Sequence, residues 1–449
     1  MTLSPAVFKA YDVRGIVPDE LDADGAYRIA NAFVRVFAPK RIAVGHDMRL
    51  SSPELAEAAV RGALDAGADV DEIGLAGTEM TYFAVGEYGY DGGFTVTASH
   101  NPAEYNGMKI VTRGALPVGS DSGLEEIKTL ALSGAAAEST RQGVRGRRDV
   151  LEAFGEKVLS LIDIDSVLPL RVVLDGANGM AGTMLAPVLP KLPIEPISFC
   201  MEPDGTFPSH QPNPLLEENR QFVIGKVLEH RADLGIAWDG DADRCFFLDE
   251  TGEFVPGDFI TALLAESMLA RVPGATILYD LRASRAVPDA IARGGGRAVK
   301  SRVGHAFIKQ RMREEEATFA GEVSGHYYFR DFYGVDTGIV PALLMLELVS
   351  LQGGSLAKLL EPLRDRYHIS GEINSRVSDV SASLAALERR FGKGAEVTHL
   401  DGLSVDFPDW HFNVRPSNTE PLLRLNLEAF SAAEMVQHRD EVLSVIREG

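Results

Sequence analysis

The segment 95–102 places one hydroxyl nucleophile beside an imidazole at the end of an apolar run. Its sequence is Thr-Val-Thr-Ala-Ser-His-Asn-Pro, with the hydroxyl on Ser99 and the imidazole on His100. β-Branched and aromatic residues at 93–97 predict a strand, and the Asn-Pro pair ends it. Ser99 should therefore project from a strand end, where the reactive groups of α/β sheets collect. Taken alone, however, the segment is more typical of an ordinary turn with a satisfied hydroxyl.

Three carboxylates follow a second apolar strand at alternating positions: Asp239, Asp241 and Asp243. Alternate residues of an extended segment point the same way, so these carboxylates should converge around a cation. A set of oxygen ligands without Cys or His favours Mg²⁺ over zinc. An EF-hand calcium loop is a competing interpretation because Glu250 falls at its last ligand position, but Arg244 stands where that loop needs glycine. A solvated acidic turn remains an alternative.

A tight turn near the C-terminus carries the groups that grip a phosphate dianion. It begins with the guanidinium of Arg415 and continues with the short side chains of Ser417, Asn418 and Thr419. An arginine and neutral donors in one turn can together satisfy several phosphate oxygens. We interpret this turn as a phosphate clamp, and an exposed polar turn is the alternative.

Further polar groups stand at turns that could face a sugar. Glu322, Ser324 and His326 offer a carboxylate, a hydroxyl and an imidazole, a set suited to vicinal hydroxyls. Two other turns supply cations and an imidazole: Arg302 with His305, and Arg14 close to Tyr11. Each of these groups is equally consistent with a structural role, such as a surface ion pair or a satisfied histidine.

The elements that must position these groups follow a repeat. Three times an apolar run ends in aspartate and opens a turn, at Asp47, Asp175 and Asp280, and a helix-compatible segment follows, such as 53–66 or 258–271. Later in each repeat a second strand leads into a loop, which carries in turn the hydroxyl, the three aspartates and the sugar-facing set. Strands alternating with helices indicate βαβ units whose loops gather at one sheet edge. We therefore predict an α/β protein with three similar mixed-sheet domains, although such turns also arise by coincidence in α/β sequences.

Composition shifts predict where the domains begin and end. Segment 133–148 is rich in Ala, Gly, Ser and Arg and is interpreted as a linker, and the pattern changes again near 370. Beyond that point, apolar residues alternate strictly at 423–428, which indicates a half-buried strand. The predicted domains are 1–148 with the Ser99 loop, 149–252 with the aspartate loop, 253–369 with the sugar-facing loop, and a smaller α+β domain at 370–449.

Charge and cysteine content argue against several classes of protein. A net charge of −21 disfavours non-specific binding to nucleic acid or to membrane surfaces. The N-terminus lacks a basic region followed by an apolar core, and proline and glutamate interrupt the longest apolar stretch, 339–349, so we expect neither a signal peptide nor a membrane span. Cys200 and Cys245, both flanked by apolar residues, are typical of buried thiols in a reducing cytoplasm. A monomer and a homodimer are both compatible with the sequence.

The four motifs occur in the order found in the α-D-phosphohexomutase superfamily, and the chain resembles its bacterial phosphomannomutase/phosphoglucomutase members from Tyr11 to Glu428. The resemblance implies three similar α/β domains and a smaller terminal domain around a central cleft. It also implies an isomerase of mannose and glucose phosphates, in which phosphorylated Ser99 donates its phosphoryl group to form a bound hexose 1,6-bisphosphate. That bisphosphate then turns over and returns its other phosphate, so that a hexose 1-phosphate becomes a hexose 6-phosphate.

By the same resemblance, each candidate residue acquires a role. Mg²⁺ would be held by Asp239, Asp241 and Asp243 together with an oxygen of Ser99. The groups expected at the reacting phosphoryl group are Arg14, Lys109, Arg244 and His326, with Lys109 or His326 as the base. The groups expected on the sugar and on its second phosphate are Tyr11, Arg302, His305, Glu322, Ser324, His326, Arg415, Ser417, Asn418 and Thr419.

Two positions favour the mannose/glucose branch over phosphoglucosamine mutases, which usually have glycine at the position of Asn418 and Ser-Ala-Ser-His around the nucleophile. Val323 and Arg282 depart from residues found in related enzymes, so the preference between the two sugars stays open. A metal-dependent sugar phosphatase and a non-catalytic sugar-phosphate-binding protein are the remaining alternatives. Release of free phosphate would distinguish the first, and binding without turnover the second.

Overall fold

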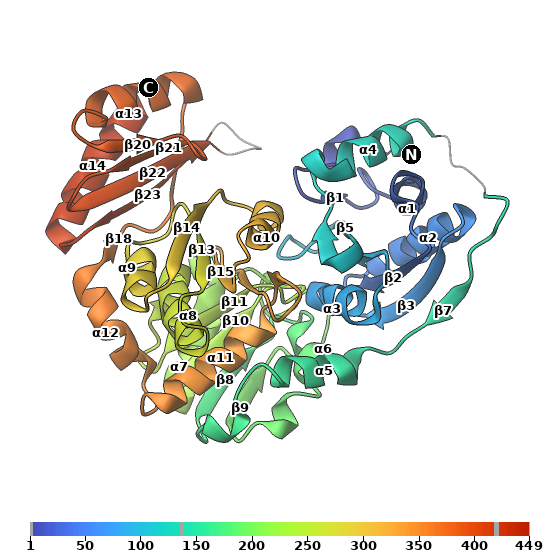
Figure 1. The fold of residues 1–449 in the computed structure, drawn as a ribbon, viewed down its shortest axis with the longest axis horizontal. Helices are drawn as coiled ribbons and strands as arrows, with labels where there is room; N and C mark the ends of the chain where they lie inside the picture. The colour runs from blue at the N-terminus through green and yellow to red at the C-terminus, as the bar shows by residue number, and fades with distance from the viewer. Residues whose placement is uncertain (1–2, 135–138, 417–421, 449) are drawn as a thin grey trace. The chain divides into compact units, whose positions relative to one another are not determined.

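The computed structural model describes residues 3–134, 139–416 and 422–448. By their internal contacts these residues form two compact units, both drawn in Figure 1. Unit 1 comprises Met1–Val255, Gly304–Phe319 and Ser324–Leu356. Unit 2 comprises Pro256–Val303, Ala320–Val323 and Ala357–Gly449.

The N-terminal part of unit 1 is a mixed sheet between helices, drawn in blue and teal in Figure 1. Its strands run in the order β1 (Val13–Ile16), β5 (Tyr105–Thr112), β4 (Gly92–Val96), β2 (Arg41–His46), β3 (Asp69–Leu75) and β7 (Arg145–Arg147), with β6 (Leu116–Pro117) beside β5. Strand β2 is parallel to β3 and β4, whereas β5 is antiparallel to β4 and β1. The helices are α1 (Ala23–Phe37), α2 (Ser52–Asp65), α3 (Thr78–Tyr88) and α4 (Glu125–Leu132).

Alternation along the strands decides which helices cover which face of this sheet. Ile42 and Val44 of β2 belong to a core that includes buried residues of α1, α2 and α4. Gly93 of β4 faces the other side, where an added Cβ would lie 3.1 Å from Val85 and 3.2 Å from Thr81 of α3. Helices α1, α2 and α4 therefore cover one face, and α3 covers the other.

The second sheet also lies in unit 1. Its strands run in the order β12 (Phe254–Val255), β11 (Cys245–Asp249), β10 (Leu234–Trp238), β8 (Arg171–Asp175) and β9 (Glu195–Phe199). Strand β8 is parallel to β9 and β10, and β11 is antiparallel to β10. The helices are α5 (Leu151–Leu159), α6 (Ala181–Leu185) and α7 (Glu217–His230). Buried residues of α7 share a core with β8, β10 and β11, so this helix covers one face of the sheet.

The third set of strands belongs partly to each unit. In unit 2, β13 (Thr276–Asp280) lies between β14 (Arg297–Ser301) and β15 (Phe319–Gly321), and the helices are α8 (Gly257–Arg271), α9 (Ala286–Arg293) and α12 (Leu356–Arg366). In unit 1, β16 (Tyr327–Phe329) and β17 (Val335–Asp336) form an antiparallel pair, and the helices are α10 (His305–Glu314) and α11 (Ile339–Leu351).

The C-terminal part of unit 2, drawn in red in Figure 1, is an antiparallel sheet with helices. The strand order is β18 (His368–Ile369), β23 (Leu422–Ala429), β22 (Trp410–Pro416), β21 (Leu403–Asp406) and β20 (Glu396–Thr398), with β19 (Ile373–Arg376) also beside β23. Helices α13 (Val380–Phe391) and α14 (Ala432–Glu448) share one apolar core with this sheet. The predicted strand at 423–428 is confirmed, but Asn426 and Glu428 are buried rather than solvent-facing. One carboxyl oxygen of Glu428 accepts a 3.1 Å hydrogen bond from the backbone N–H of Arg285, and burial raises the pKa of this group to about 8.

Short helical turns complete the described chain: η1 (Pro5–Val7), η2 (Arg113–Ala115), η3 (Ser120–Leu124), η4 (Ile164–Ser166) and η5 (Leu189–Lys191). Among the described residues, no single helix is long and apolar enough to cross a membrane. Helices α11 and α12 reach the necessary length and hydropathy only when counted together as a bent pair.

The predicted repeat is confirmed by both topology and hydrogen bonding. In each repeat the first strand lies between the second and the third: β2 between β3 and β4, β8 between β9 and β10, and β13 between β14 and β15. Each first strand leads into its aspartate, whose Oδ1 accepts the backbone N–H two residues later. The N···O distances are 3.0 Å at Asp47, 3.0 Å at Asp175 and 2.8 Å at Asp280. The repeated aspartate therefore forms an Asx turn that opens each βα connection.

Two local expectations need correction. The predicted linker contains strand β7, because Arg145 forms ion pairs of 2.6 Å with Glu57 and 2.8 Å with Glu72 that hold the segment beside β3. Cys245 is buried as expected, whereas Cys200 is only partly buried. Cys200 lies in a turn at φ 53° directly after β9, and its sulfur lies within 4.8 Å of ligand atoms of Asp175 and His210.

Candidate active site

Ser99 occupies a turn that follows β4, and its backbone adopts the left-handed conformation with φ 50°. This conformation is uncommon for a residue with a side chain. The backbone N–H of Ser99 donates to Thr97 Oγ1 at 2.9 Å, and Ser99 Oγ donates to Asp239 Oδ2 at 2.8 Å. Ser99 Oγ also lies 3.2 Å from Nδ1 of His100. Burial lowers the pKa of His100, and nearby arginines act in the same direction, so this imidazole is neutral beside the hydroxyl.

The three predicted aspartates converge in the loop between β10 and β11. All three are buried, and one carboxylate oxygen from each lies within 4.8 Å of the others. Burial and the charges of Asp241 and Asp243 raise the pKa of Asp239, as expected for crowded carboxylates. Oδ1 of Asp241 and Oδ1 of Asp243 are buried and accept no hydrogen bond from the described residues. Crowded, incompletely satisfied carboxylates fit a bound cation, so this set could hold a metal ion.

Lys109 extends from β5 into the same group of carboxylates. Its strand is antiparallel to β4, in a register that pairs Lys109 with Thr95. Nζ lies 2.7 Å from Asp241 Oδ2 and also donates to Asp243. Burial opposes the charge on Lys109, but the two carboxylates outweigh it and raise its pKa. The ammonium group therefore stays charged and partly neutralises the acidic loop.

Arg244 and His326 also lie beside the aspartates. Arg244 Nε is 3.7 Å from Asp239 Oδ2 and donates a 3.2 Å hydrogen bond to His326 Nε2. Nδ1 of His326 lies 3.1 Å from the Ser324 hydroxyl. The arginine can only donate, so Nε2 of His326 accepts this bond, and the same nitrogen also lies 3.5 Å from Asp243 Oδ1. The aspartate loop and the 324–326 segment are joined by a 3.0 Å hydrogen bond from the N–H of Cys245 to the carbonyl of Gly325.

Arg14, Tyr11 and His305 join the same group of residues in unit 1. Arg14 Nη1 donates to the Asn101 side chain at 2.7 Å, which ties β1 to the Ser99 turn. The ring of Tyr11 meets His305 edge-on at a centroid distance of 5.7 Å. The His305 ring in turn lies 6.4 Å from that of His326.

The structure thus brings together most of the predicted site residues within unit 1. These are Tyr11, Arg14, Ser99, Lys109, Asp239, Asp241, Asp243, Arg244, His305, Ser324 and His326. Unit 2 contains Arg302, which is exposed, Glu322, which is buried, and Arg415, which is partly buried. Nε of Arg415 is buried and makes no hydrogen bond with the described residues. Ser417, Asn418 and Thr419 lie outside the described residues.

Two side chains that support the site carry no motif in the sequence. Thr78, at the start of α3, donates its hydroxyl proton to Asp241 Oδ2. Arg49, two residues after the first repeated aspartate, donates to backbone carbonyls of the Ser99 turn. The Asp-x-Arg spacing was visible at 47–49, but nothing in it indicated which segment the guanidinium would contact.

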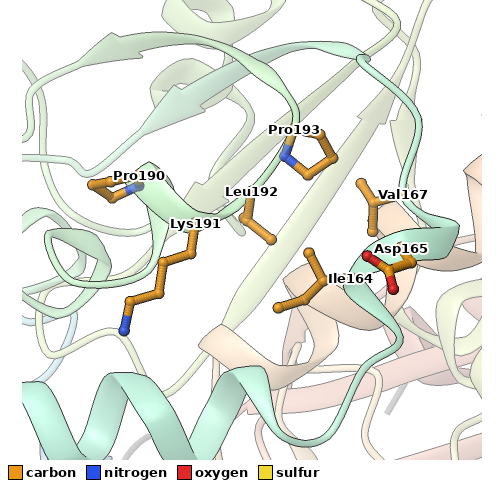
Figure 2. A pocket seen from close by; sticks show the side chains of 7 residues that line it. All are labelled: Ile164, Asp165, Val167, Pro190, Lys191, Leu192 and Pro193. Carbon is orange, nitrogen blue, oxygen red and sulfur yellow. The ribbon is translucent and has the colours of Figure 1, made fainter.

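A separate pocket of about 340 Å³ lies between η4 and η5 of unit 1, as Figure 2 shows. Its lining is mostly aliphatic and includes Ile164, Val167 and Leu192, with Asp165 and Lys191 at its sides. None of the predicted site residues lines it. This pocket is therefore separate from the predicted site around Ser99.

Four family models match successive parts of the chain. Three are described as phosphoglucomutase/phosphomannomutase alpha/beta/alpha domains, with domain I at 5–137, domain II at 151–252 and domain III at 256–367. The fourth, the phosphoglucomutase/phosphomannomutase C-terminal domain, matches 372–445.

Full-length comparisons agree with the family models. The chain is 45% identical over 451 residues to "Phosphohexose mutases" of Xanthomonas campestris, covering 100% of both chains. It is 44% identical over 448 residues to the phosphomannomutase of Salmonella montevideo, covering 98% of each. A crystal structure of a phosphoglucomutase/phosphomannomutase family protein from Burkholderia thailandensis matches with a TM-score of 0.89 and 32% identity, covering 100% of this chain and 98% of that one. The chain therefore belongs to the phosphoglucomutase/phosphomannomutase family and is a phosphohexose mutase.

Proposed function

We propose that this isomerase interconverts the 1-phosphates and 6-phosphates of mannose and glucose through phosphorylated Ser99 and a bound hexose 1,6-bisphosphate. The observation that carries the proposal is the 2.8 Å hydrogen bond from Ser99 Oγ to Asp239, within a buried set of carboxylates and cations. A hydroxyl in such surroundings can carry a phosphoryl group because nearby cationic side chains, such as Lys109 and Arg244, can offset the negative charge of the phosphate.

The residues Asp239, Asp241, Asp243 and Ser99 would hold Mg²⁺, whose chemistry would be to neutralise charge on the phosphoryl oxygens. Lys109 and Arg244 flank the carboxylates and would stabilise the negative charge that develops as the phosphoryl group moves. Arg14 contacts the Ser99 turn through Asn101 and would act beside the reacting phosphoryl group.

In the transfer step, the bond from phosphorus to Ser99 Oγ breaks while a bond forms to the free hydroxyl oxygen of the sugar phosphate. Of the two candidate bases, Lys109 is kept in its charged form by the carboxylates, so His326 would accept the proton of that hydroxyl. In the second half, after the bisphosphate has turned over, the bond from its other phosphorus to the sugar oxygen breaks while a bond forms to Ser99 Oγ, and the proton held by His326 passes to that sugar oxygen. Ser99 is thereby rephosphorylated, and the product carries its phosphate at the other carbon.

The remaining residues would recognise the sugar and its non-reacting phosphate in either orientation. Glu322 and Ser324 would contact the sugar hydroxyls. Tyr11, Arg302 and His305 would contact other parts of the sugar and its non-reacting phosphate. The phosphate would be bound by Arg415, Ser417, Asn418 and Thr419. The buried Nε of Arg415 supports this assignment, because an anion would satisfy it.

The domain boundaries 1–148, 149–252, 253–369 and 370–449 remain our proposal, and the residues matched by the four family models support them. We also propose a cytoplasmic enzyme that acts on small sugar phosphates, as a monomer or homodimer. The two free thiols, Cys200 and Cys245, support a reducing compartment.

The test is a comparison of wild type with Ser99→Ala, using the surface variant Ser160→Ala as the matched control. Phosphopeptide mapping after incubation with glucose 1,6-bisphosphate should find phosphate on Ser99 in the wild type and the control only. Coupled assays on mannose 1-phosphate and glucose 1-phosphate should show turnover in the same two proteins. Near-normal turnover by Ser99→Ala with the bisphosphate primer would refute the scheme, and stoichiometric release of free phosphate would identify a phosphatase.

A further inference from the structure

A fully buried arginine lies between the first repeated aspartate and the turn that carries Ser99. The side chain of Arg49 is 0% exposed. Its Nε donates to Asp47 Oδ2 at 3.2 Å. The other four N–H groups donate to backbone carbonyls of the turn and of the start of β5: Nη2 to Ser99 at 2.7 Å and Asn101 at 2.7 Å, and Nη1 to Pro102 at 2.6 Å and Tyr105 at 3.0 Å.

An arginine side chain has five N–H donors, and each donor of Arg49 has an acceptor in the protein. No donor is left for a phosphate, and no surface of the guanidinium is open to one. Arg49 therefore does not bind substrate, and its effect must pass through the turn that it holds.

The backbone and side chain of Arg49 are held by Asp47, at the end of β2. The Asp47 carboxylate accepts the N–H of Arg49 at 3.0 Å and the hydroxyl of Ser52 at 2.5 Å. The side-chain amide of Asn106, on β5, donates to Ser52 Oγ at 2.9 Å. The guanidinium is thus anchored to two strands of the sheet before it reaches the Ser99 turn.

The loop that follows β9 covers the Arg49 side chain. The ring of Phe207 lies over the Arg49 guanidinium at 5.1 Å from its centroid. Gly205 approaches so closely that an added Cβ would lie 2.6 Å from the Cα of Arg49. This loop shields the hydrogen bonds of Arg49 from water, which strengthens them.

The carbonyl of Ser99 is confined on two sides. Arg49 Nη2 donates to it, and Gly240 of the aspartate loop lies where a Cβ would be only 2.4 Å from the same oxygen. The left-handed conformation of Ser99 is unfavourable on its own and persists only where its surroundings impose it. Arg49 constrains this turn with a full charge, through one hydrogen bond to the carbonyl of Ser99 and three to carbonyls that follow it.

We propose that Arg49 is a positioning residue, which holds Ser99 in its left-handed conformation and so keeps Oγ in line for phosphoryl transfer. This inference rests on the proposed role of Ser99 as the phosphoryl carrier. Without the guanidinium, the turn would relax toward an ordinary backbone conformation and carry Oγ away from Asp239. A shift of this kind slows transfer but leaves sugar-phosphate recognition, which other residues perform, almost unchanged.

The test uses Arg49→Lys, which keeps the positive charge but cannot reach four carbonyls. We expect kcat and the rate of Ser99 phosphorylation by glucose 1,6-bisphosphate to fall by about 100-fold, with KM for mannose 1-phosphate within a few-fold of wild type. The matched control is Arg313→Lys, since Arg313 also holds three carbonyls of unit 1, those of Lys309 at 2.9 Å, Gly114 at 2.8 Å and Tyr333 at 3.2 Å. It should retain kcat even if its melting temperature drops.

A milder variant keeps the inference testable if Arg49→Lys does not fold. Phe207→Leu removes the ring over the guanidinium and leaves every hydrogen bond of Arg49 available, so kcat should fall in the same direction but less. If Arg49→Lys folds and keeps the wild-type kcat, the positioning role is wrong. If Arg49→Lys does not fold, a wild-type kcat in Phe207→Leu would overturn the role instead. If instead the wild type takes up no phosphate on Ser99, the proposed function is wrong.

Discussion

Ser99 Oγ and Asp239 Oδ2 are 2.8 Å apart although their residues are separated by 140 positions in the chain. Each residue lies in the loop that follows the third strand of its own repeat, β4 for Ser99 and β10 for Asp239. Gly240 allows the two loops to approach, because a side chain there would collide with the carbonyl of Ser99. The repeat therefore does more than build sheets: it supplies two equivalent loops that meet at Ser99 and Asp239.

Removing the hydroxyl of Thr78 should weaken metal binding without unfolding the protein. This hydroxyl donates to Asp241 and orients one of the proposed ligands, and loss of such a partner typically costs 10 to about 100-fold in affinity. We expect Thr78→Val to bind Mg²⁺ at least about 10-fold more weakly in calorimetric titrations. Thr81→Val on the same helix is the control, because the Thr81 hydroxyl is buried and bonds to none of the described residues. Equal losses in both variants would show that the effect is not specific to the ligand.

Replacing Lys109 with methionine should destabilise the protein in a way that Mg²⁺ reverses. The ammonium group lies between Asp241 and Asp243, and removing one partner of a buried ion pair costs about 3–5 kcal/mol. A divalent cation held by the same carboxylates would restore part of the lost free energy of unfolding, measured by urea denaturation with and without Mg²⁺. KCl at matched ionic strength should restore little, because buried charges are weakly screened. Equal recovery with KCl would argue against a specific metal site.

The local parts of the site follow from the sequence because they depend on neighbouring residues. The strand before Ser99, the alternating aspartates and the Asx turns each need only a few consecutive positions. Arg49 is different: its partners are backbone carbonyls as far as 56 positions away, and every residue has a carbonyl. No residue type therefore marks the segment that a clamp of this kind will hold.

The sequence also could not predict that polar residues of the strands are buried. Alternation placed Glu428 on a solvent face, yet this carboxylate is buried and accepts a hydrogen bond from the backbone N–H of Arg285, 143 positions earlier. Strand β7 has the composition of a linker, and it pairs with β3 because Glu57 and Glu72 hold Arg145. In both cases a distant partner overrides the local pattern, which is the usual limit of β-propensity.

The pair of His210 and Asp175 should make stability fall as the pH rises above neutrality. His210 Nε2 lies 3.0 Å from Asp175 Oδ2. Burial opposes the charge on His210, but the Asp175 carboxylate and the Cys200 thiol outweigh it and raise its pKa from 6.5 to about 10. Because the folded pKa lies above the unfolded one, the stabilisation is complete below pH 6.5 and is lost as the pH approaches 10. In urea denaturation series across this range, His210→Gln should flatten the decline, while the exposed-site control His399→Gln should keep the wild-type slope. A decline unchanged in His210→Gln would assign the pH dependence to other groups.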